Sequence, residues 1–285
     1  MAGNSELQSV RNQGRWQGFA NLFRKENRLW WGSRRWWVQL LIWLALMNGI
    51  LFLGIGVAPN AEPLPGSDAD GQAALGAGAS PEELAVIGLV TFLKLAGIAA
   101  AIGVVVLGQE TLLNEKHTGT AAWVLSKPVT RGAVIMSKLL SYSFGILVTM
   151  VVTQGVIAYL IIWLITGVAM PILPFAGALG ILFLALLFWL TFTVMLSALT
   201  NSRGVVLGVA LFLVLAFVLV GMLPTWISDF MPWNLTSDMS PTRPALAGSL
   251  AMGQALPTLM PFIASAVWCV LFAVIAIWRF RREEF

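Results

Sequence analysis

The apolar runs of this chain constrain its fold more than any other feature. Several exceed the roughly 20 residues that a helix needs to cross ~30 Å of hydrocarbon. Of the 285 residues, 58% are hydrophobic and only 11% are charged, and the mean hydropathy is +0.84. A soluble domain carries charge on about a quarter of its residues. The sequence therefore predicts an all-α integral membrane protein.

The same runs predict six transmembrane helices. These spans cover residues 36–57, 84–108, 139–166, 174–199, 204–223 and 259–278. Together they form one transmembrane domain over 36–278, between an N-terminal segment (1–35) and a tail (279–285). Segments 58–83 and 224–258 are predicted as outer loops, the second with short helices on or in the outer membrane face. Segment 109–138 is predicted as a cytosolic loop.

The basic residues predict the orientation. Fifteen of the 17 Lys and Arg residues belong to segments on one side of the predicted membrane, and seven of these precede the first span. The other eight are Lys116, Lys127, Arg131, Lys138, Arg203, Arg279, Arg281 and Arg282. Under the positive-inside rule both termini are cytoplasmic, in the inner (plasma) membrane. Because no apolar run lies near the start, the first span is expected to be a retained anchor.

The N-terminal segment 1–35 is predicted to form an amphipathic helix on the membrane surface. On a helical wheel one side holds Trp16, Phe19, Phe23 and Trp30, and the opposite side holds Arg24, Arg28 and Arg35. Such a helix places its apolar side in the acyl boundary and its cations at anionic headgroups. The alternative is an ordinary basic flank of the first span.

Segment 109–138 carries the most functional information. The second helix, which Ser80, Pro81 and Glu83 are expected to cap at its start, can continue to about Gly119. A short apolar helix over 120–125 then presents Trp123 and Leu125 to the cytoplasm. Pro128 ends that helix, and Thr130 can cap the next one. Exposed apolar surface of this kind usually meets a partner.

The residues of this segment resemble those of the ABC-2-type permease family. The shared features are a glutamate at the end of span two, then Gly119-Thr120, the run from Leu125 through Pro128 to Arg131, and Lys138. Arg24-Lys25-Glu26, the run 196–203 and Arg281-Arg282-Glu283 are also similar to that family. The resemblance implies a coupling helix seated in an ATPase subunit and an N-terminal elbow helix. The residues expected at the ATPase contact are Glu110, Gly119, Thr120, Trp123, Leu125, Pro128 and Arg131.

The expected partners follow from the same features. No Gly-x-x-x-x-Gly-Lys-Ser/Thr motif occurs, so ATP is expected in a separate cytosolic ABC ATPase, in two copies, with no cofactor or metal in this chain. The resemblance also implies a second permease chain, identical or related, and export as the direction. Membrane lipid and accessory or extracytoplasmic subunits are further expected partners. Nucleic acid is not, because the basic residues follow topology despite a pI of about 9.6.

Two other functions are weighed against a permease subunit. An ion-driven secondary carrier needs ionisable residues within the bilayer, and Lys94 is the only one in the predicted spans. A membrane-embedded enzyme has one candidate cluster, Glu110, Asn114 and His117, which is short of a zinc ligand set. Lys94 either extends to the outer headgroups or lines a pathway for an anionic cargo. Gly204 and Gly208 form a small-x-x-x-small pair that can pack helices together.

Overall fold

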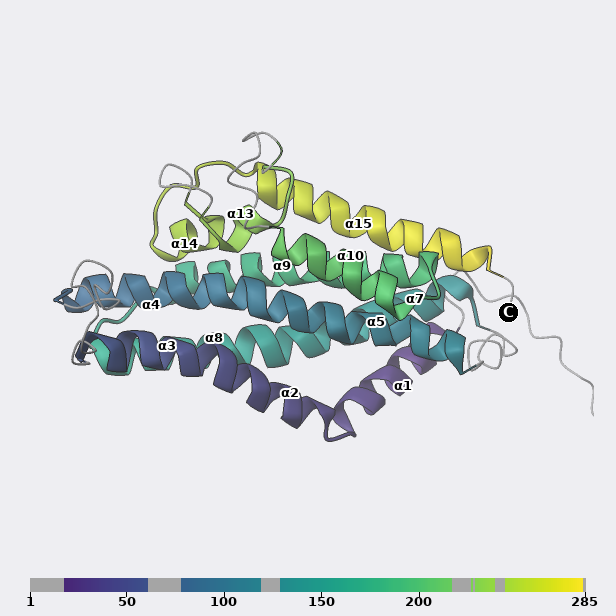
Figure 1. The fold of residues 1–285 in the computed structure, drawn as a ribbon, viewed down its shortest axis with the longest axis horizontal. Coiled ribbons are helices and arrows are strands. Elements are labelled where there is room, and N and C mark those ends of the chain that lie inside the picture. Colours follow the sequence, from purple (N-terminus) through teal and green to yellow (C-terminus); the bar gives the residue numbers. More distant parts are fainter. Residues whose placement is uncertain are drawn as a thin grey trace, which may run out of the picture.

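The structure is a computed structural model that describes residues 18–60, 78–118, 129–216, 227, 229–238 and 244–283. These residues form helices and turns and no strand. The long helices run along one axis and build an elongated bundle, with α1 at an angle to it (Figure 1). The predicted all-α fold is confirmed for the described part of the chain.

The helices fall into three continuous stretches and several single elements. The chain begins with α1 (Phe19–Trp31). Helix one contains α2 (Arg35–Trp43), α3 (Ile50–Phe52) and the π-helical turns η1 (Leu44–Gly49) and η2 (Leu53–Val57), and the 3₁₀ turn η3 (Ala58–Asn60) follows it. Helix two contains α4 (Pro81–Leu95), η4 (Ala96–Ala100) and α5 (Ala101–His117). Helix three contains α7 (Arg131–Ile146), η5 (Leu147–Val152) and α8 (Thr153–Thr166). The others are α9 (Ile172–Leu199), α10 (Arg203–Leu215), α13 (Trp233–Thr236), α14 (Leu246–Ala251) and α15 (Met260–Arg281).

Five helical stretches are long and apolar enough to cross a membrane. They are Trp36–Val57, Pro81–Lys116, Arg131–Thr166, Ile172–Leu199 and Met260–Arg281. The predicted fifth span corresponds to α10, which is shorter, and residues 217–223 of that span lie outside the described residues. Five of the six predicted spans are therefore found, and the predicted fifth span (204–223) stays a prediction.

Local sequence signals set the ends of helices two and three. Ser80 caps α4 through a hydrogen bond from the Glu83 amide, and the Glu83 carboxylate accepts one from the Ser80 amide at 2.8 Å. Thr130 caps α7, because its hydroxyl accepts a hydrogen bond from the Ala133 amide at 3.3 Å. Both caps match the sequence prediction. Helix two ends at His117, close to the expected stop near Gly119.

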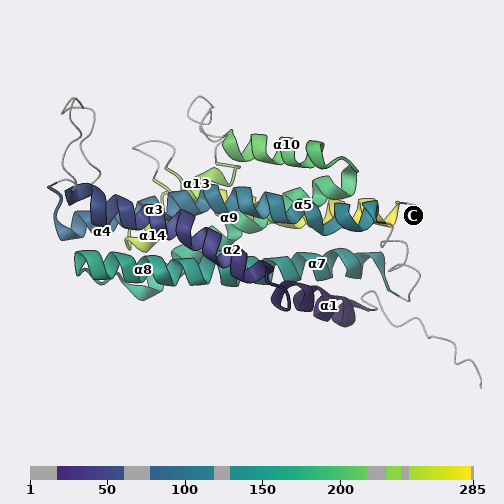
Figure 2. The same cartoon turned by 60° about the horizontal axis from the view of Figure 1, so that its bottom comes forward.

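Helix α9 forms the centre of the bundle and packs against α5, α14 and α15 (Figures 1 and 2). Of its most apolar stretch 67% is buried, against 28% for the first and last candidate spans. Phe188 and Phe192 of α9 pack against Phe272 of α15 at ring distances of 5.5 and 5.2 Å. The outer helices therefore leave apolar side chains exposed, as expected where a bundle meets lipid.

Two polar side chains join helices one and three inside the bundle. The Asn48 amide donates a hydrogen bond to the Gln154 side-chain oxygen at 2.7 Å, and both residues are buried. The Gln154 amide in turn donates to the Thr149 carbonyl at 3.0 Å. Polar contacts of this kind hold helices together where water is absent.

Segment 224–258 contains the short helices α13 and α14, as predicted, within its described residues. Both pack on α9, and α13 also reaches the middle of helix two. Thr236 lies so close to Gly97 that a Cβ at that position would overlap its side chain. Gly97 therefore permits the approach of α13 to helix two.

Helix α1 differs from the prediction in the surroundings of its apolar side. It packs along α7, and Trp30 is buried against Tyr142, with ring centroids 5.2 Å apart (Figure 2). Trp30 was expected in the acyl boundary, so that expectation is wrong. Gly145 of α7 explains the contact, because any side chain there would overlap the Trp30 ring. Trp16 lies outside the described residues.

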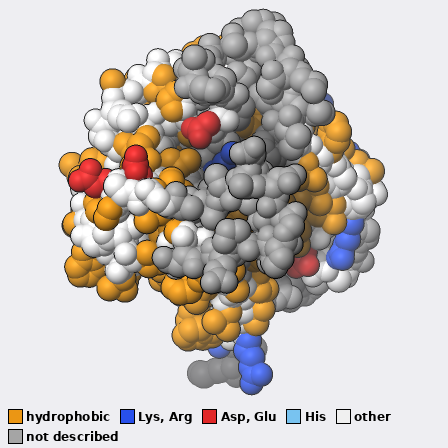
Figure 3. All heavy atoms as spheres, turned by 60° about the vertical axis from the view of Figure 1, so that its left-hand side comes forward, with side chains coloured by type: hydrophobic (Ala, Val, Ile, Leu, Met, Phe, Trp, Pro, Cys, Tyr) orange, Lys and Arg blue, Asp and Glu red, His pale blue; other side chains and the backbone are white. Residues whose placement is uncertain are grey.

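The two ends of the bundle carry different side chains. The basic end contains the ends of α5 and α15 and the starts of α7 and α10 (Figure 1). The far end contains the starts of α4 and α9 and the end of α8. Apolar side chains cover much of the described far end around a few acidic ones (Figure 3). Leu173 at this end is 84% exposed.

Candidate functional site

The basic end positions the two helices that flank the predicted coupling segment. Helix α5 leads into that segment and α7 follows it. Gly119, Thr120, Trp123, Leu125 and Pro128 lie outside the described residues. The structure therefore describes the site through the end of α5, the start of α7 and the elements that contact them.

A buried charge cluster joins three helices at this end. Lys138 of α7 lies 2.9 Å from the Glu115 carboxylate of α5 and 3.1 Å from the Glu26 carboxylate of α1. Lys138 is 4% exposed and Glu26 is 8% exposed. Lys25 extends the cluster, with its amine 3.8 Å from Glu115. One lysine thus bridges the coupling flanks to α1.

The cluster fixes position more than it adds stability. Removing charges from water costs several kcal/mol per ion, so a buried ion pair is often no better than an apolar pair of the same shape. Breaking such a pair is different, because the remaining charge is left buried, at a cost of about 3–5 kcal/mol. With carboxylates on two other helices, Lys138 therefore favours one arrangement of α1, α5 and α7.

The end of α5 is bonded to two further elements. Lys116 lies 2.9 Å from the Glu283 carboxylate, and it donates to the Asn201 side-chain oxygen at 3.2 Å. Asn201 belongs to the turn between α9 and α10, and Glu283 follows α15. Arg203 at the start of α10 lies 3.5 Å from the Asn114 side-chain oxygen, at the limit of a hydrogen bond.

The start of α7 is bonded to the end of α15. Arg131 donates hydrogen bonds to the carbonyls of Arg281 and Glu283, each at 2.7 Å. Carbonyls at a helix C-terminus lack partners within the helix and carry partial negative charge, so a guanidinium is well placed there. Both flanks of segment 119–128 are therefore held by charged side chains.

Comparison with known proteins decides the family. A family model described as ABC-2 family transporter protein matches residues 20–285. The chain belongs to the ABC-2 transporter family. It is also similar to the probable ABC transporter permease protein NosY of Stutzerimonas stutzeri, with 27% identity over 279 residues, covering 90% of this chain and 93% of the relative. The resemblance found in the sequence is thereby confirmed, and this ABC-2 chain is an integral membrane transporter protein.

The two described coupling candidates of this ABC-2 chain differ in their surroundings. Arg131 lies within the bonded network. Glu110 is exposed, whereas Glu115 forms the ion pair with Lys138, and sequence reasoning missed Glu115. The signal was Lys138 itself, because a lysine at the start of an apolar helix needs a carboxylate nearby when it is buried.

The remaining polar candidates were considered as metal ligands. Among the described residues, no group of three or more His, Cys, Asp or Glu could hold a metal ion. Glu110 and Asn114 are both exposed on α5. These two side chains therefore lie at the surface of the basic end.

The exposed face of helix two carries Lys94. Lys94 is exposed, and so are Val86 before it and Val106 after it on the same helix. Ile98, one turn from Lys94, lines a small cavity together with Val214 of α10. On α10 itself, Gly204, Val205, Gly208 and Val209 are exposed, and a Cβ at Gly208 would meet no atom of the described chain within 4 Å. Two neighbouring helices of this ABC-2 chain thus present open faces.

Proposed function

We propose that this chain is the permease subunit of an ABC exporter whose segment 109–138 docks a separate cytosolic ATPase. The observation that carries the proposal is the anchoring of both flanks of segment 119–128. Lys116 and Glu115 hold the end of α5, and Arg131 and Lys138 hold the start of α7. A force applied to the segment would therefore pass directly to α1, the turn before α10 and α15.

The proposed orientation places the basic end in the cytoplasm of the inner membrane. Its support is the positive-inside distribution of Lys and Arg. Cysteines at Ser80 and Ser202, both exposed and at opposite ends, test it in a chain with Cys269→Ala. A membrane-impermeant thiol reagent added to intact cells should label Ser80→Cys. It should label Ser202→Cys only after permeabilisation, and the reverse pattern would invert the orientation.

We propose a second permease chain as the partner of the open face of α10. Glycines four residues apart let helix backbones approach closely, and Val205, Val209 and Phe212 extend the same face with 50%, 43% and 69% exposure. The helix packs against α5 and α9 on its other side. A pathway is then expected between the two chains, beside the α5–α10 surface.

Lys94 is the candidate pathway residue in this arrangement. Ile98, one turn after Lys94 on helix two, lines one cavity with Val214, which is next to the described end of α10. Lys94 therefore lies near that end of α10. A dimer through α10 would bring the exposed face of helix two toward the second chain. Lys94→Gln should then abolish cargo stimulation of ATP hydrolysis while basal hydrolysis survives. Unchanged stimulation would mean that the amine extends to the headgroups instead.

The docking experiment compares two tryptophans. Trp123→Ala removes the proposed anchor, and large aromatics often contribute ~2 kcal/mol or more at such interfaces. Trp163→Ala is the control, because Trp163 lies at the far end and is 46% exposed. Tagged chains are purified from their host membranes, and bound P-loop ATPase and its hydrolysis are measured. Equal retention of the ATPase by both variants, with equal stimulation, would place the docking surface elsewhere.

A further inference from the structure

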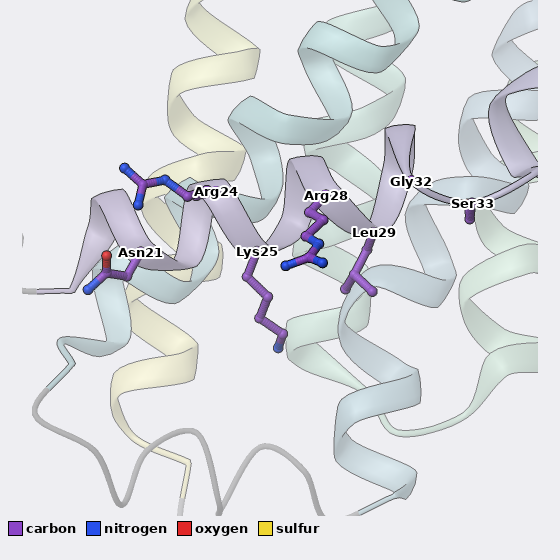
Figure 4. A pocket seen from close by; sticks show the side chains of 7 residues that line it. All are labelled: Asn21, Arg24, Lys25, Arg28, Leu29, Gly32 and Ser33. Carbon is purple, nitrogen blue, oxygen red and sulfur yellow. The ribbon is translucent and has the colours of Figure 1, made fainter.

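A basic pocket lies where α1 turns into helix one. It has a volume of about 490 Å³ and is open on one side. Its lining residues are Asn21, Arg24, Lys25, Arg28, Leu29, Gly32 and Ser33. Lys25, Arg28 and Leu29 extend from one side of α1 (Figure 4). The Ser33 hydroxyl donates to the Trp30 carbonyl at 3.2 Å, and the Gly32 amide donates to the Arg28 carbonyl at 2.8 Å. Those bonds hold the turn that closes the pocket.

The charge of this pocket is not balanced within the described part of the chain. Arg24 and Arg28 are exposed, and neither forms an ion pair with another described residue. Lys25 shares the Glu115 carboxylate with Lys138 at a distance of 3.8 Å, and the Lys25 side chain is still 45% exposed. The Arg24 guanidinium extends away from the side of α1 that carries Lys25 and Arg28 (Figure 4). The cations on that side are therefore the Arg28 guanidinium and the Lys25 amine, and both kinds of group bind phosphate.

The pocket lies where charged and apolar contacts of α1 meet. The charged contact is Glu26 with Lys138, and the aromatic one is Trp31 with Phe144, whose ring centroids are 5.9 Å apart. Those two α7 residues are separated by six positions, or ~9 Å of helix. The distance between the charged contact and the aromatic contact is therefore similar to the thickness of a headgroup layer, which is ~5–8 Å on each side of the hydrocarbon.

Apolar side chains continue from the pocket toward helix one. Leu29 in the pocket wall is 58% exposed, and Trp37 just beyond it is 54% exposed. Trp36 stacks on Trp37 with ring centroids 4.0 Å apart. Exposed tryptophans favour the membrane interface, whereas a docking surface for a soluble anion needs no such neighbours. The partner is thus expected to have an anionic head and an apolar body.

We propose that this pocket binds the phosphate group of an anionic membrane lipid, with Lys25 and Arg28 as its ligands. The acyl chains lie along Leu29 and the exposed face of helix one. This site is separate from the proposed ATPase contact and does not depend on it. It holds α1 at the membrane surface while Glu26 holds α1 to α7.

The test measures binding of phosphatidylglycerol to the full chain by native mass spectrometry in detergent, with phosphatidylcholine as the zwitterionic comparison. Lys25→Gln with Arg28→Gln removes both proposed ligands. Arg34→Gln with Arg282→Gln removes two exposed arginines outside the pocket and is the matched control. Each basic residue near a membrane surface contributes ~1 kcal/mol to anionic lipid binding, so the pocket variant, which loses two, should bind phosphatidylglycerol about thirtyfold more weakly. The control should bind it as the unaltered chain does.

Three results would overturn the proposal. Equal weakening in both double variants would indicate diffuse attraction to the basic end instead of a site. Displacement of phosphatidylglycerol by millimolar inorganic phosphate, but not by chloride at the same ionic strength, would indicate a site for free phosphate. Loss of the co-purified ATPase with unchanged lipid binding would assign this face to the protein partner. Size-exclusion profiles of each variant verify that the fold is intact.

Discussion

At the basic end, charged side chains join the helices: Lys138 lies 2.9 Å from Glu115 and 3.1 Å from Glu26. Toward the far end, small residues do so, because Gly97 admits Thr236 of α13 and Gly177 admits Leu250 of α14. Nearby, the buried side chains of Trp233, Ser249 and Ser265 have polar atoms without a hydrogen-bond partner among the described residues. Unpaired buried polar atoms cost about 1–3 kcal/mol each.

These two kinds of contact respond differently when helices move apart. Separating a buried ion pair leaves charges in an apolar environment, so the basic end strongly favours a single arrangement. Separating a glycine from a neighbouring side chain loses only dispersion contacts, which are individually small. We therefore expect the basic end to transmit displacement as a unit and the helices to part in the half nearer the far end.

The largest effect is expected from Lys138→Met, which breaks the basic end. It removes the buried amine between Glu26 and Glu115 and leaves them only the half-exposed Lys25, 4.0 and 3.8 Å away, at a cost of about 3–5 kcal/mol. The measurement is the loss of folded protein on heating or in denaturant, in detergent. Lys94→Met is the control, since it removes an exposed lysine from an apolar helix.

A rescue variant separates charge from packing in that prediction. Glu26→Gln and Glu115→Gln, added to Lys138→Met, remove the two negative charges that lose the buried amine and should recover most of the lost stability. If the triple variant stays as unstable as Lys138→Met alone, the lysine acts through packing, and the distinction drawn between the two ends fails.

A smaller effect is expected from Gly97→Ala, in the half of the bundle nearer the far end. The new methyl would overlap Thr236, and overpacking of this kind costs about 1–3 kcal/mol. Adding Thr236→Ala makes room and should restore part of the stability. The measurement is again thermal unfolding of the purified chain. A stable Gly97→Ala protein without that compensation would show that α13 already shifts freely, and the contact with helix two would then be unimportant.

The open face of α10 offers a third kind of contact to test. A Cβ at Gly208 would meet no described atom within 4 Å, so Gly208→Leu should leave folding unchanged, within about 0.5 kcal/mol. If α10 joins two permease chains, the same change should still weaken the dimer at least tenfold, as measured by mass photometry at decreasing concentration. Gly180→Leu on α9 is the matched control, because that glycine is also exposed without a neighbour. Equal dimer loss in both variants would remove α10 as the interface.

The sequence predicted well the features that depend on local composition. Hydropathy located five spans, and the Ser80 and Thr130 caps were recognised from residue type and spacing. The family resemblance was recognised from residues that the family model also covers. These signals lie within one helix or one loop, so no knowledge of packing is needed to read them.

Features that depend on contacts between distant segments were harder to predict. Trp30 was assigned to lipid because a helical wheel shows an apolar side but not which surface covers it. Gly145, the residue that admits Trp30, is 115 positions away in the sequence. Glu115 was passed over in favour of Glu110 for the same reason, since the partner that selects it, Lys138, lies on another helix.

The smallest effect is expected at the start of helix two, where the far end depends on a local cap. The Ser80 hydroxyl accepts from the Glu83 amide, and Glu83 accepts from the Ser80 amide at 2.8 Å, with both side chains exposed. Ser80→Ala should therefore cost ~1 kcal/mol and be felt locally. The measurement is hydrogen–deuterium exchange of a peptide over 78–90, which should speed up about fivefold while Tm barely changes. Glu82→Gln is the control, an exposed neighbouring carboxylate outside the cap. Faster exchange at the basic end as well would show that the two ends are coupled through helix two.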